Sequence, residues 1–337
     1  MVFDFAGQSL YITTSTGIVN SYNLATQTLG PSYNLGGSLN GLDIARDNSY
    51  LLVAQNGTGV SQGSFQRVDL PSGTITNINY TRASGETGAW DVAIGSNGLA
   101  LATTQFGGSG WVPLHQIDPS TNSITTRTDA PSAGFSGQVR QNTQIQRSAD
   151  GSRFYLLESN ISSGPIFTYS AKTNTFGPSA QDNAFNDFAS AAVNRNGSLL
   201  GTRVFGQAAS LDTAPNFGFV HSFNGIDSGV AFDGVREIFY GVSTSTSQII
   251  AYDTNTFAEL FRLSIGENLN GVRAVDQFST GELVASPDGR YLALETPQGI
   301  RLFAVPEPGT SALVCLALLL AFGATRLPRG VAGTARK

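Results

Sequence analysis

The feature that most constrains the fold is a repeat of about 47 residues that runs from residue 1 to residue 304. Each copy contains a short apolar run that ends in an aromatic or aliphatic residue followed by a small, usually polar one. Six clear copies and a seventh are Val19–Asn23, Phe65–Asp69, Leu114–Asp118, Ile166–Ser170, Ala208–Asp212, Ile249–Asp253 and Ile300–Ala304. Such a period is typical of repeat architectures, in which each unit packs against its neighbours.

Turn residues on both sides of each run indicate how many strands a unit holds. Thr or Ser follows the run three residues later in five copies, as expected for a turn between two strands: Thr26, Ser72, Thr121, Thr173 and Thr256. Upstream of the run, Asn-Gly or Asp-Gly marks a second hairpin at 97–98, 150–151, 196–197, 233–234 and 288–289. Two hairpins give four short strands, which is typical of a β-propeller blade.

We therefore predict an all-β fold, a β-propeller of seven blades with four strands each. The expected blades are 1–38, 39–87, 88–138, 139–186, 187–227, 228–278 and 279–304. Six or eight blades also fit, because residues 264–280 are poorly periodic. Leu283–Ala293, with Ser286-Pro287-Asp288-Gly289 at its turn, resembles the inner hairpin of YVTN and related WD40-like propeller repeats. No long segment has a helical period, which argues against an α/β enzyme.

Composition excludes several classes of function. The net charge is -5 and only two of the 19 basic residues are lysines, so we expect no nucleic-acid partner. The single cysteine, Cys315, excludes an internal disulfide and a cysteine-based zinc cluster. Phosphate-binding and metal-binding motifs are absent, so no cofactor is expected. His115 and His221 lie in strand-like sequence without a nucleophile elbow, and no catalytic residue is assigned.

The end of the chain differs from the repeat. Residues 309–325 carry no charge and are just long enough for a short transmembrane helix. The prolines of Pro306-Glu307-Pro308 prevent a helix from running on from the body. Four basic residues and no acid follow, which are Arg326, Arg329, Arg336 and Lys337. By the positive-inside rule, residues 330–337 form a cytoplasmic tail and the acidic body lies across the membrane.

Pro-Glu-Pro, a short apolar helix and an arginine-bearing end, in this order over residues 305–329, resemble the PEP-CTERM sorting signal of exported bacterial proteins. The resemblance implies that an exosortase recognises Pro306, Glu307 and Pro308 and removes the tail. It also implies transient anchoring in the inner membrane and delivery to the cell surface or the extracellular matrix. A permanent single-span anchor and a buried core helix are the alternatives.

The start of the chain shows no leader for export, because Met1 falls directly at the first strand of blade 1. Blade 7 has sequence for three strands only, since the sorting signal begins where a fourth would follow. Propellers usually close by pairing an N-terminal strand with the last blade, which avoids an open sheet edge. We therefore expect the native reading frame to extend upstream by a signal peptide and about one strand.

Aspartates recur on the predicted innermost strands of the first three blades. Asp4, Asp43 and Asp91 occupy equivalent positions, and Gln144 stands at the matching place in blade 4. Since such positions face the central channel, we predict an acidic arc that raises a carboxyl pKa or attracts a cation. Whether it holds a metal ion stays open. The alternative is that each aspartate bonds the loop entering its own blade.

Trp111 is the candidate aromatic ligand contact. It follows the glycine-rich stretch Phe106–Gly110 between the second and third strands of blade 3. An exposed ring at this place would stack on a sugar. The alternative is that Trp111 packs at the edge of the blade.

The propeller fold and the predicted export to the cell surface together predict a non-enzymatic recognition scaffold whose loops bind polysaccharide or protein. The alternative is a propeller enzyme, lactonase-like or lyase-like, with Asp43, Asp91 and Arg273 around the channel. Scarce histidine and the lack of a recognisable acid/base pair favour the scaffold. A concave apolar pocket with convergent polar groups would favour the enzyme.

Overall fold

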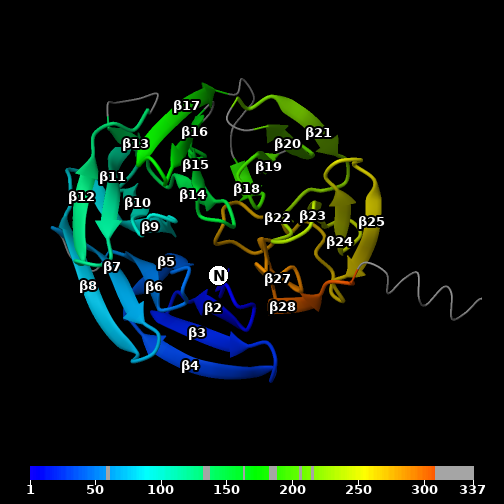
Figure 1. The fold of residues 1–337 in the computed structure, drawn as a ribbon, viewed down its shortest axis with the longest axis horizontal. Coiled ribbons are helices and arrows are strands. Elements are labelled where there is room, and N and C mark those ends of the chain that lie inside the picture. The colour runs from blue at the N-terminus through cyan, green and yellow to red at the C-terminus, as the bar shows by residue number, and fades with distance from the viewer. Residues whose placement is uncertain are drawn as a thin grey trace, which may run out of the picture.

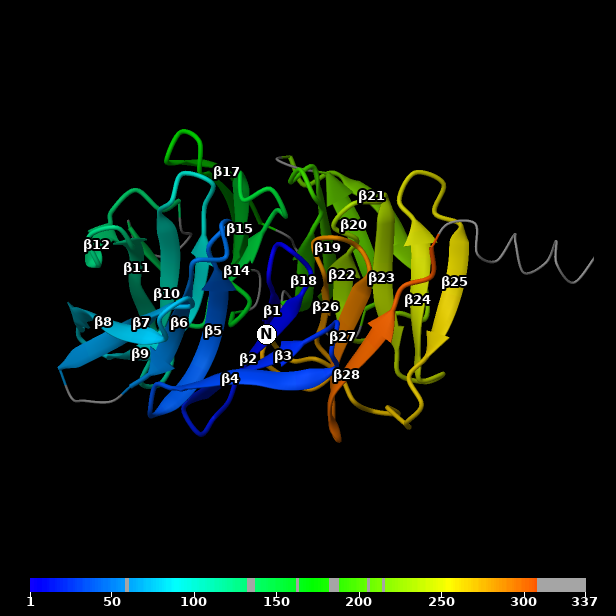
Figure 2. The same cartoon turned by 60° about the horizontal axis from the view of Figure 1, so that its bottom comes forward.

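The structure, a computed structural model, describes residues 1–57, 61–131, 137–161, 164–181, 188–204, 207–213 and 216–307. In this part of the chain, seven antiparallel sheets surround one axis, like the blades of a fan (Figure 1). The first strand of each sheet lies nearest the axis and the last lies at the rim (Figure 2). The predicted all-β, seven-bladed propeller is therefore confirmed.

The first three blades contain thirteen strands. Blade 1 consists of β1 (Val2–Phe3), β2 (Ser9–Thr13), β3 (Ile18–Asn23) and β4 (Thr28–Asn34). Blade 2 consists of β5 (Ser38–Ile44), β6 (Tyr50–Asn56), β7 (Gln62–Asp69) and β8 (Thr74–Thr81). Blade 3 consists of β9 (Glu86–Ile94), β10 (Ala100–Phe106), β11 (Trp111–Asp118) and β12 (Ser123–Arg127), with β13 (Gln138–Arg140) as an extra strand beside β11.

The remaining four blades follow the same order. Blade 4 holds β14 (Gln144–Arg147), β15 (Arg153–Leu157), β16 (Pro165–Ser170) and β17 (Thr175–Gln181). Blade 5 holds β18 (Phe188–Val193), β19 (Leu199–Val204), β20 (Ala209–Thr213) and β21 (Phe219–Phe223). Blade 6 holds β22 (Val230–Phe232), β23 (Ile238–Ser243), β24 (Gln248–Asp253) and β25 (Glu259–Ser264). Blade 7 holds β26 (Leu283–Ala285), β27 (Tyr291–Thr296) and β28 (Gly299–Ala304).

Blade 7 thus has three strands within the described residues, as the sequence indicated. The predicted number of seven blades is confirmed, because the aperiodic stretch after β25 contains no strand and adds no blade. The described residues contain no helix, and none therefore that is long and apolar enough to span a membrane. The predicted helix at 309–325 and the basic tail at 330–337 lie outside the described residues.

Burial decreases from the inner strands to the rim. The second strand of a blade packs against neighbouring blades on both faces, so its residues form a nearly continuous buried apolar run, as in β6, β15 and β23. The outer strands β4, β12 and β25 expose most of their residues to solvent. The core therefore consists of apolar layers between adjacent blades, such as Leu52 and Ala54 of β6 against Val92 of β9.

Candidate functional site

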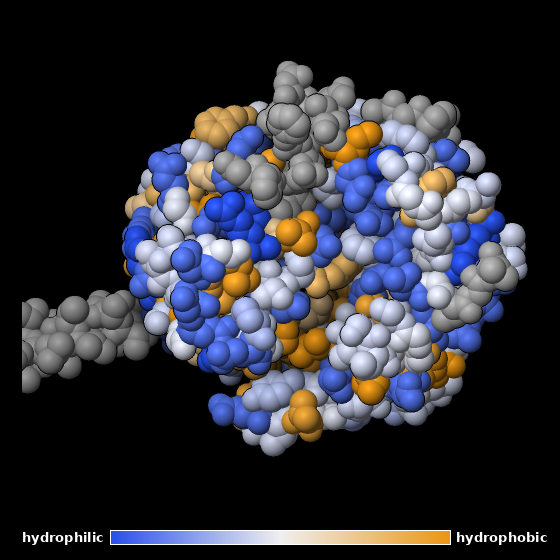
Figure 3. Space-filling view, turned by 180° about the vertical axis from the view of Figure 1, so that it is seen from behind, coloured by the Kyte–Doolittle hydropathy of each residue, from blue (hydrophilic) through white to orange (hydrophobic). Residues whose placement is uncertain are grey.

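A cavity of about 230 Å³ lies at the centre of the ring. Residues from the inner part of all seven blades line it, and most of them are alanine, valine, leucine or phenylalanine. Seen from behind, apolar residues gather around a hollow near the middle of the molecule (Figure 3). Eight of the 29 lining residues are polar or charged, among them Asp43, Asp91 and Glu282. Such a composition is typical of small-molecule sites.

The connection from β25 to β26 crosses the channel. Its first half packs into the core between blades 6 and 7 through Ile265 and Leu269. Its second half reaches the opposite wall, where Gln277 accepts a hydrogen bond of 2.9 Å from Gln146 of blade 4. Phe278 packs edge-on against Trp90 of blade 3, with ring centroids 4.9 Å apart. This connection, residues 265–282, therefore forms part of the cavity wall (Figure 1).

Asp43 and Asp91 each join two blades. Asp43 Oδ2 accepts the backbone amide of Ile94 in β9 at 2.7 Å, and Asp91 Oδ2 accepts that of Ile145 in β14 at 2.7 Å. Each aspartate therefore bonds the innermost strand of the next blade, an arrangement that the sequence analysis did not predict. Irregular pairing in the preceding part of β5 and β9 accompanies both aspartates, and such bulges redirect side chains.

Asp4 bonds within its own blade, to the turn between β1 and β2 rather than to the loop that enters the blade. Its carboxylate accepts the backbone amide of Gln8 at 2.7 Å, within the turn between β1 and β2. Asp4 does not line the cavity, whereas Asp43 and Asp91 do. Over the described ranges, no three His, Cys, Asp or Glu side chains gather closely enough to hold a metal ion. Asp4, Asp43 and Asp91 therefore do not form a three-carboxylate metal site.

The two cavity aspartates differ in charge environment. Arg147 of β14 forms an ion pair of 2.7 Å with Asp43, and both side chains are largely buried. Asp91 is 4% exposed and has no ion-pair partner among the described residues. Burial raises the pKa of Asp91 to about 7, although Gln277 and the amides of Ile145 and Val92 bond to its carboxylate. Asp91 therefore changes its charge near neutral pH.

Glu282 is a second buried acid on the cavity wall, and the sequence analysis missed it. It immediately precedes β26 and is 4% exposed. Burial raises the pKa of Glu282 to about 8, and Asp276 adds to this effect while a bond to Ser190 opposes it. Within the described part of the chain, Glu282 Oε2 has no hydrogen-bond partner. The available signal was an acid placed directly before an apolar inner strand.

Trp111 starts β11 and is half-buried rather than free. The guanidinium of Arg140, in the neighbouring strand β13, lies over its ring at 5.9 Å from the centroid. Arg140 is itself buried and donates to the carbonyl oxygens of Gly110 and Asn160. Trp111 therefore lies at the edge of the blade, the position that the sequence analysis named as the alternative to a sugar contact. Arg273, the candidate enzyme arginine, is exposed and does not line the cavity.

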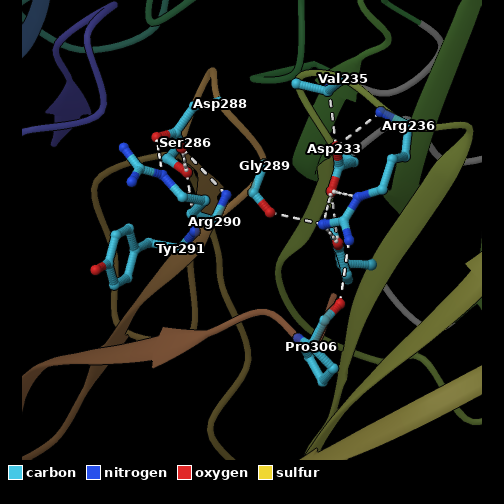
Figure 4. A network of polar contacts seen from close by, with 10 residues as sticks. Asp233, Val235, Arg236, Ser286, Asp288, Gly289, Arg290, Tyr291 and Pro306 are labelled. Carbon is cyan, nitrogen blue, oxygen red and sulfur yellow. Dashed lines mark hydrogen bonds and ion pairs between the residues drawn. The ribbon is translucent and has the colours of Figure 1, made fainter. Parts of the chain in front are cut away.

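The residues of the predicted sorting signal begin at the end of the described chain. Pro306 and Glu307 are its last residues, and Pro308 lies outside it. Arg236 Nη1 donates to the carbonyl oxygen of Pro306 at 3.1 Å, and its Nη2 donates to that of Gly289 at 2.6 Å (Figure 4). Asp233 pairs with the same guanidinium at 2.5 Å. Arg236 therefore connects Pro306, near the end of the described chain, to residues of blades 6 and 7.

Comparisons with known proteins place the chain among β-propellers by fold alone. No family model matches the sequence, and no curated protein matches it. The chain is similar to the β-propeller domain of Cps50 (Swd1) from Myceliophteria thermophila, with a TM-score of 0.65, 14% identity, and coverage of 90% of this chain and 96% of that one. It is also similar to hydrazine synthase from Kuenenia stuttgartiensis, with a TM-score of 0.64, 10% identity, and coverage of 90% and 94%.

Proposed function

We propose that this chain is an exported β-propeller that acts as a non-enzymatic recognition scaffold at the cell surface or in the extracellular matrix. Its loops would bind polysaccharide or protein, and an exosortase would remove the tail after Pro306-Glu307-Pro308 is recognised. Before removal, residues 309–325 would anchor the chain in the inner membrane. The acidic composition leaves nucleic acid out of the expected partners.

The observation that carries this proposal is how the last described residues, just before the uncharged segment, are held against the ring. Arg236 holds Pro306 against blades 6 and 7, and Val305 is buried in their shared core. The next residues of the sequence complete Pro-Glu-Pro and enter the uncharged segment. The last strand of the ring, β28, ends at Ala304, directly before Pro-Glu-Pro, which agrees with a body that is released when the tail is cut off.

Export and processing can be tested in the native host. In the wild-type protein, we expect mass spectrometry to show a mature chain that ends near Glu307 and occurs in the surface fraction. The double variant Pro306→Ala, Glu307→Ala should keep Lys337 and remain in the membrane fraction, because the recognised motif is gone. Pro31→Ala, an exposed proline of β4, is the matched control. A wild-type chain that retains Lys337, or a variant processed normally, would contradict the proposal.

One observation favours a second candidate, a propeller enzyme of the lactonase-like or lyase-like kind. Asp91 lines an apolar cavity and its pKa is raised to about 7, which suits a general acid or base. Asp43 fits this role less well, because Arg147 neutralises it. Lactone hydrolysis that is present in the wild type and lost in Asp91→Asn, but retained in the exposed-site variant Asp129→Asn, would favour the enzyme.

A further inference from the structure

We propose that the central cavity binds a small primary amine with an apolar body, and that Asp91 and Glu282 hold its ammonium group. This binding site is independent of the sorting proposal, because it involves only the inner wall of the ring. Three observations carry it: two acids of the wall have no ion-pair partner among the described residues, one carboxylate oxygen has no hydrogen-bond partner there, and the lining is mostly apolar.

The charge balance of the wall leaves two acids without a counter-ion. Of the four acids that line the cavity, Asp43 pairs with Arg147 and Asp233 pairs with Arg236. Asp91 and Glu282 have no such partner in the described part of the chain. Arg195 also lines the cavity, but it is exposed to solvent, so it does not neutralise the buried acids. The buried Arg203 acts on Glu282 electrostatically, but its Nη2 donates to the carbonyl oxygen of Ala274, and no ion pair joins the two side chains within the described residues. A bound cation would therefore balance Asp91 and Glu282 once they release their protons.

The second observation is a carboxylate oxygen of Glu282 that could accept a hydrogen bond from a ligand. Glu282 Oε2 is buried and has no hydrogen-bond partner among the residues that the structure describes, although buried polar atoms in proteins are almost always bonded. An ammonium group offers three N–H donors and a positive charge, so one group can serve this oxygen and a second carboxylate. A neutral alcohol offers a single donor and no charge.

The remaining wall defines the rest of the ligand. Val92, Ala191, Val230 and Phe278 are among its apolar residues, which suit an alkyl or aromatic body. The volume of about 230 Å³ is below the range for drug-sized ligands, so the amine must be small. A divalent metal ion is a poorer match, since the described residues bring no three ligating side chains together.

Binding should strengthen as pH rises, because burial keeps both acids protonated to about pH 7 and 8. The charged or titratable groups that act on them are Asp43 with Arg147, and Asp276, Glu295, Arg203 and the Met1 amino group. An alkylamine stays protonated to about pH 10, as a lysine side chain does. If an acid of the cavity must release its proton before the amine binds, the affinity for the amine falls by about tenfold for each pH unit below the pKa of that acid.

The test is calorimetric titration of the full-length protein at pH 8.5 with methyl-, butyl- and benzylammonium chloride, and with 1-butanol and butyrate as neutral and anionic probes. We expect an ammonium probe to bind, 1-butanol and butyrate not to bind, and the affinity to fall at least about tenfold at pH 6.5. Glu282→Gln should weaken binding at least about tenfold, because the variant cannot ionise. Glu259→Gln, on the exposed strand β25, should leave binding unchanged.

Three results would overturn the proposal: no ammonium probe binds, 1-butanol binds as well as butylammonium, or Glu282→Gln and Glu259→Gln bind alike. Glutamine has nearly the shape of a protonated glutamate, so Glu282→Gln should fold. The pH profile of the wild-type protein gives a second test that needs no substitution. An affinity that is constant between pH 6.5 and 8.5 would count against Asp91 and Glu282 as the ammonium ligands.

Discussion

Glu282→Gln is expected to make the protein more stable at pH 7, by about 3 kcal/mol, and to leave its stability unchanged at pH 4. The pKa of Glu282 is raised from an ordinary 4.5 to about 8 in the folded protein. Between these values the folded protein keeps the proton and the unfolded chain releases it. Wild-type stability therefore falls as pH rises from about 4.5 to about 8. Glutamine resembles the protonated acid and has no proton to release, so the variant does not lose stability over this pH range.

Urea unfolding of Glu282→Gln and the wild type at pH 4, 7 and 9 measures this effect as a difference in the free energy of unfolding. The difference should be near zero at pH 4, grow through pH 7 and reach its full size at pH 9. Glu259→Gln serves as the control, because Glu259 is an exposed residue of β25 whose ion pair with Arg262 is also exposed. A variant less stable than the wild type at pH 7, or a difference independent of pH, would refute the buried-acid assignment.

Phe239→Ala is expected to lower the free energy of unfolding by about 3 to 5 kcal/mol. Phe239 in β23 is fully buried between blades 5 and 6. Its ring lies 5.0 Å from that of Phe223 in blade 5 and 5.1 Å from that of Phe232 in blade 6, between centroids. Alanine would leave a cavity in the layer that joins these blades.

The matched control for Phe239→Ala is Leu260→Ala, because Leu260 lies on the rim strand β25 and is 48% exposed. We expect this variant to change the free energy of unfolding by less than about 1 kcal/mol. Urea unfolding of both proteins gives the comparison. Equal losses in the two variants would show that the contact between blades 5 and 6 is not part of the folded core.

The repeat allowed the fold to be predicted because blade strands depend on local patterns. The Asp-Gly at 150–151 and 288–289 lies in the turns between the first and second strands of blades 4 and 7. The second strands contain long apolar runs, since both of their faces are buried. The extra strand β13 was missed, because its three residues carry no repeat and pair only with the first part of β11.

The cavity could be predicted only in part. Of the three aspartates that the sequence analysis placed at equivalent positions on inner strands, Asp43 and Asp91 line the cavity and Asp4 does not. The bonds of Asp43 and Asp91 to the following blade were not predictable, because they depend on how two sheets are placed relative to each other. The connection 265–282 was not predictable either, since a segment without regular structure follows no period. Glu282 was missed for the same reason.

A crystal structure of the protein would test most directly the claim that a closed ring encloses an acidic, largely apolar cavity. The account predicts seven sheets around one axis, with Gln277 bonded to Gln146 across the channel and Glu282 facing the central cavity. Sheets that do not circle a common axis, or residues 265–282 packed on the outside of the ring, would contradict it.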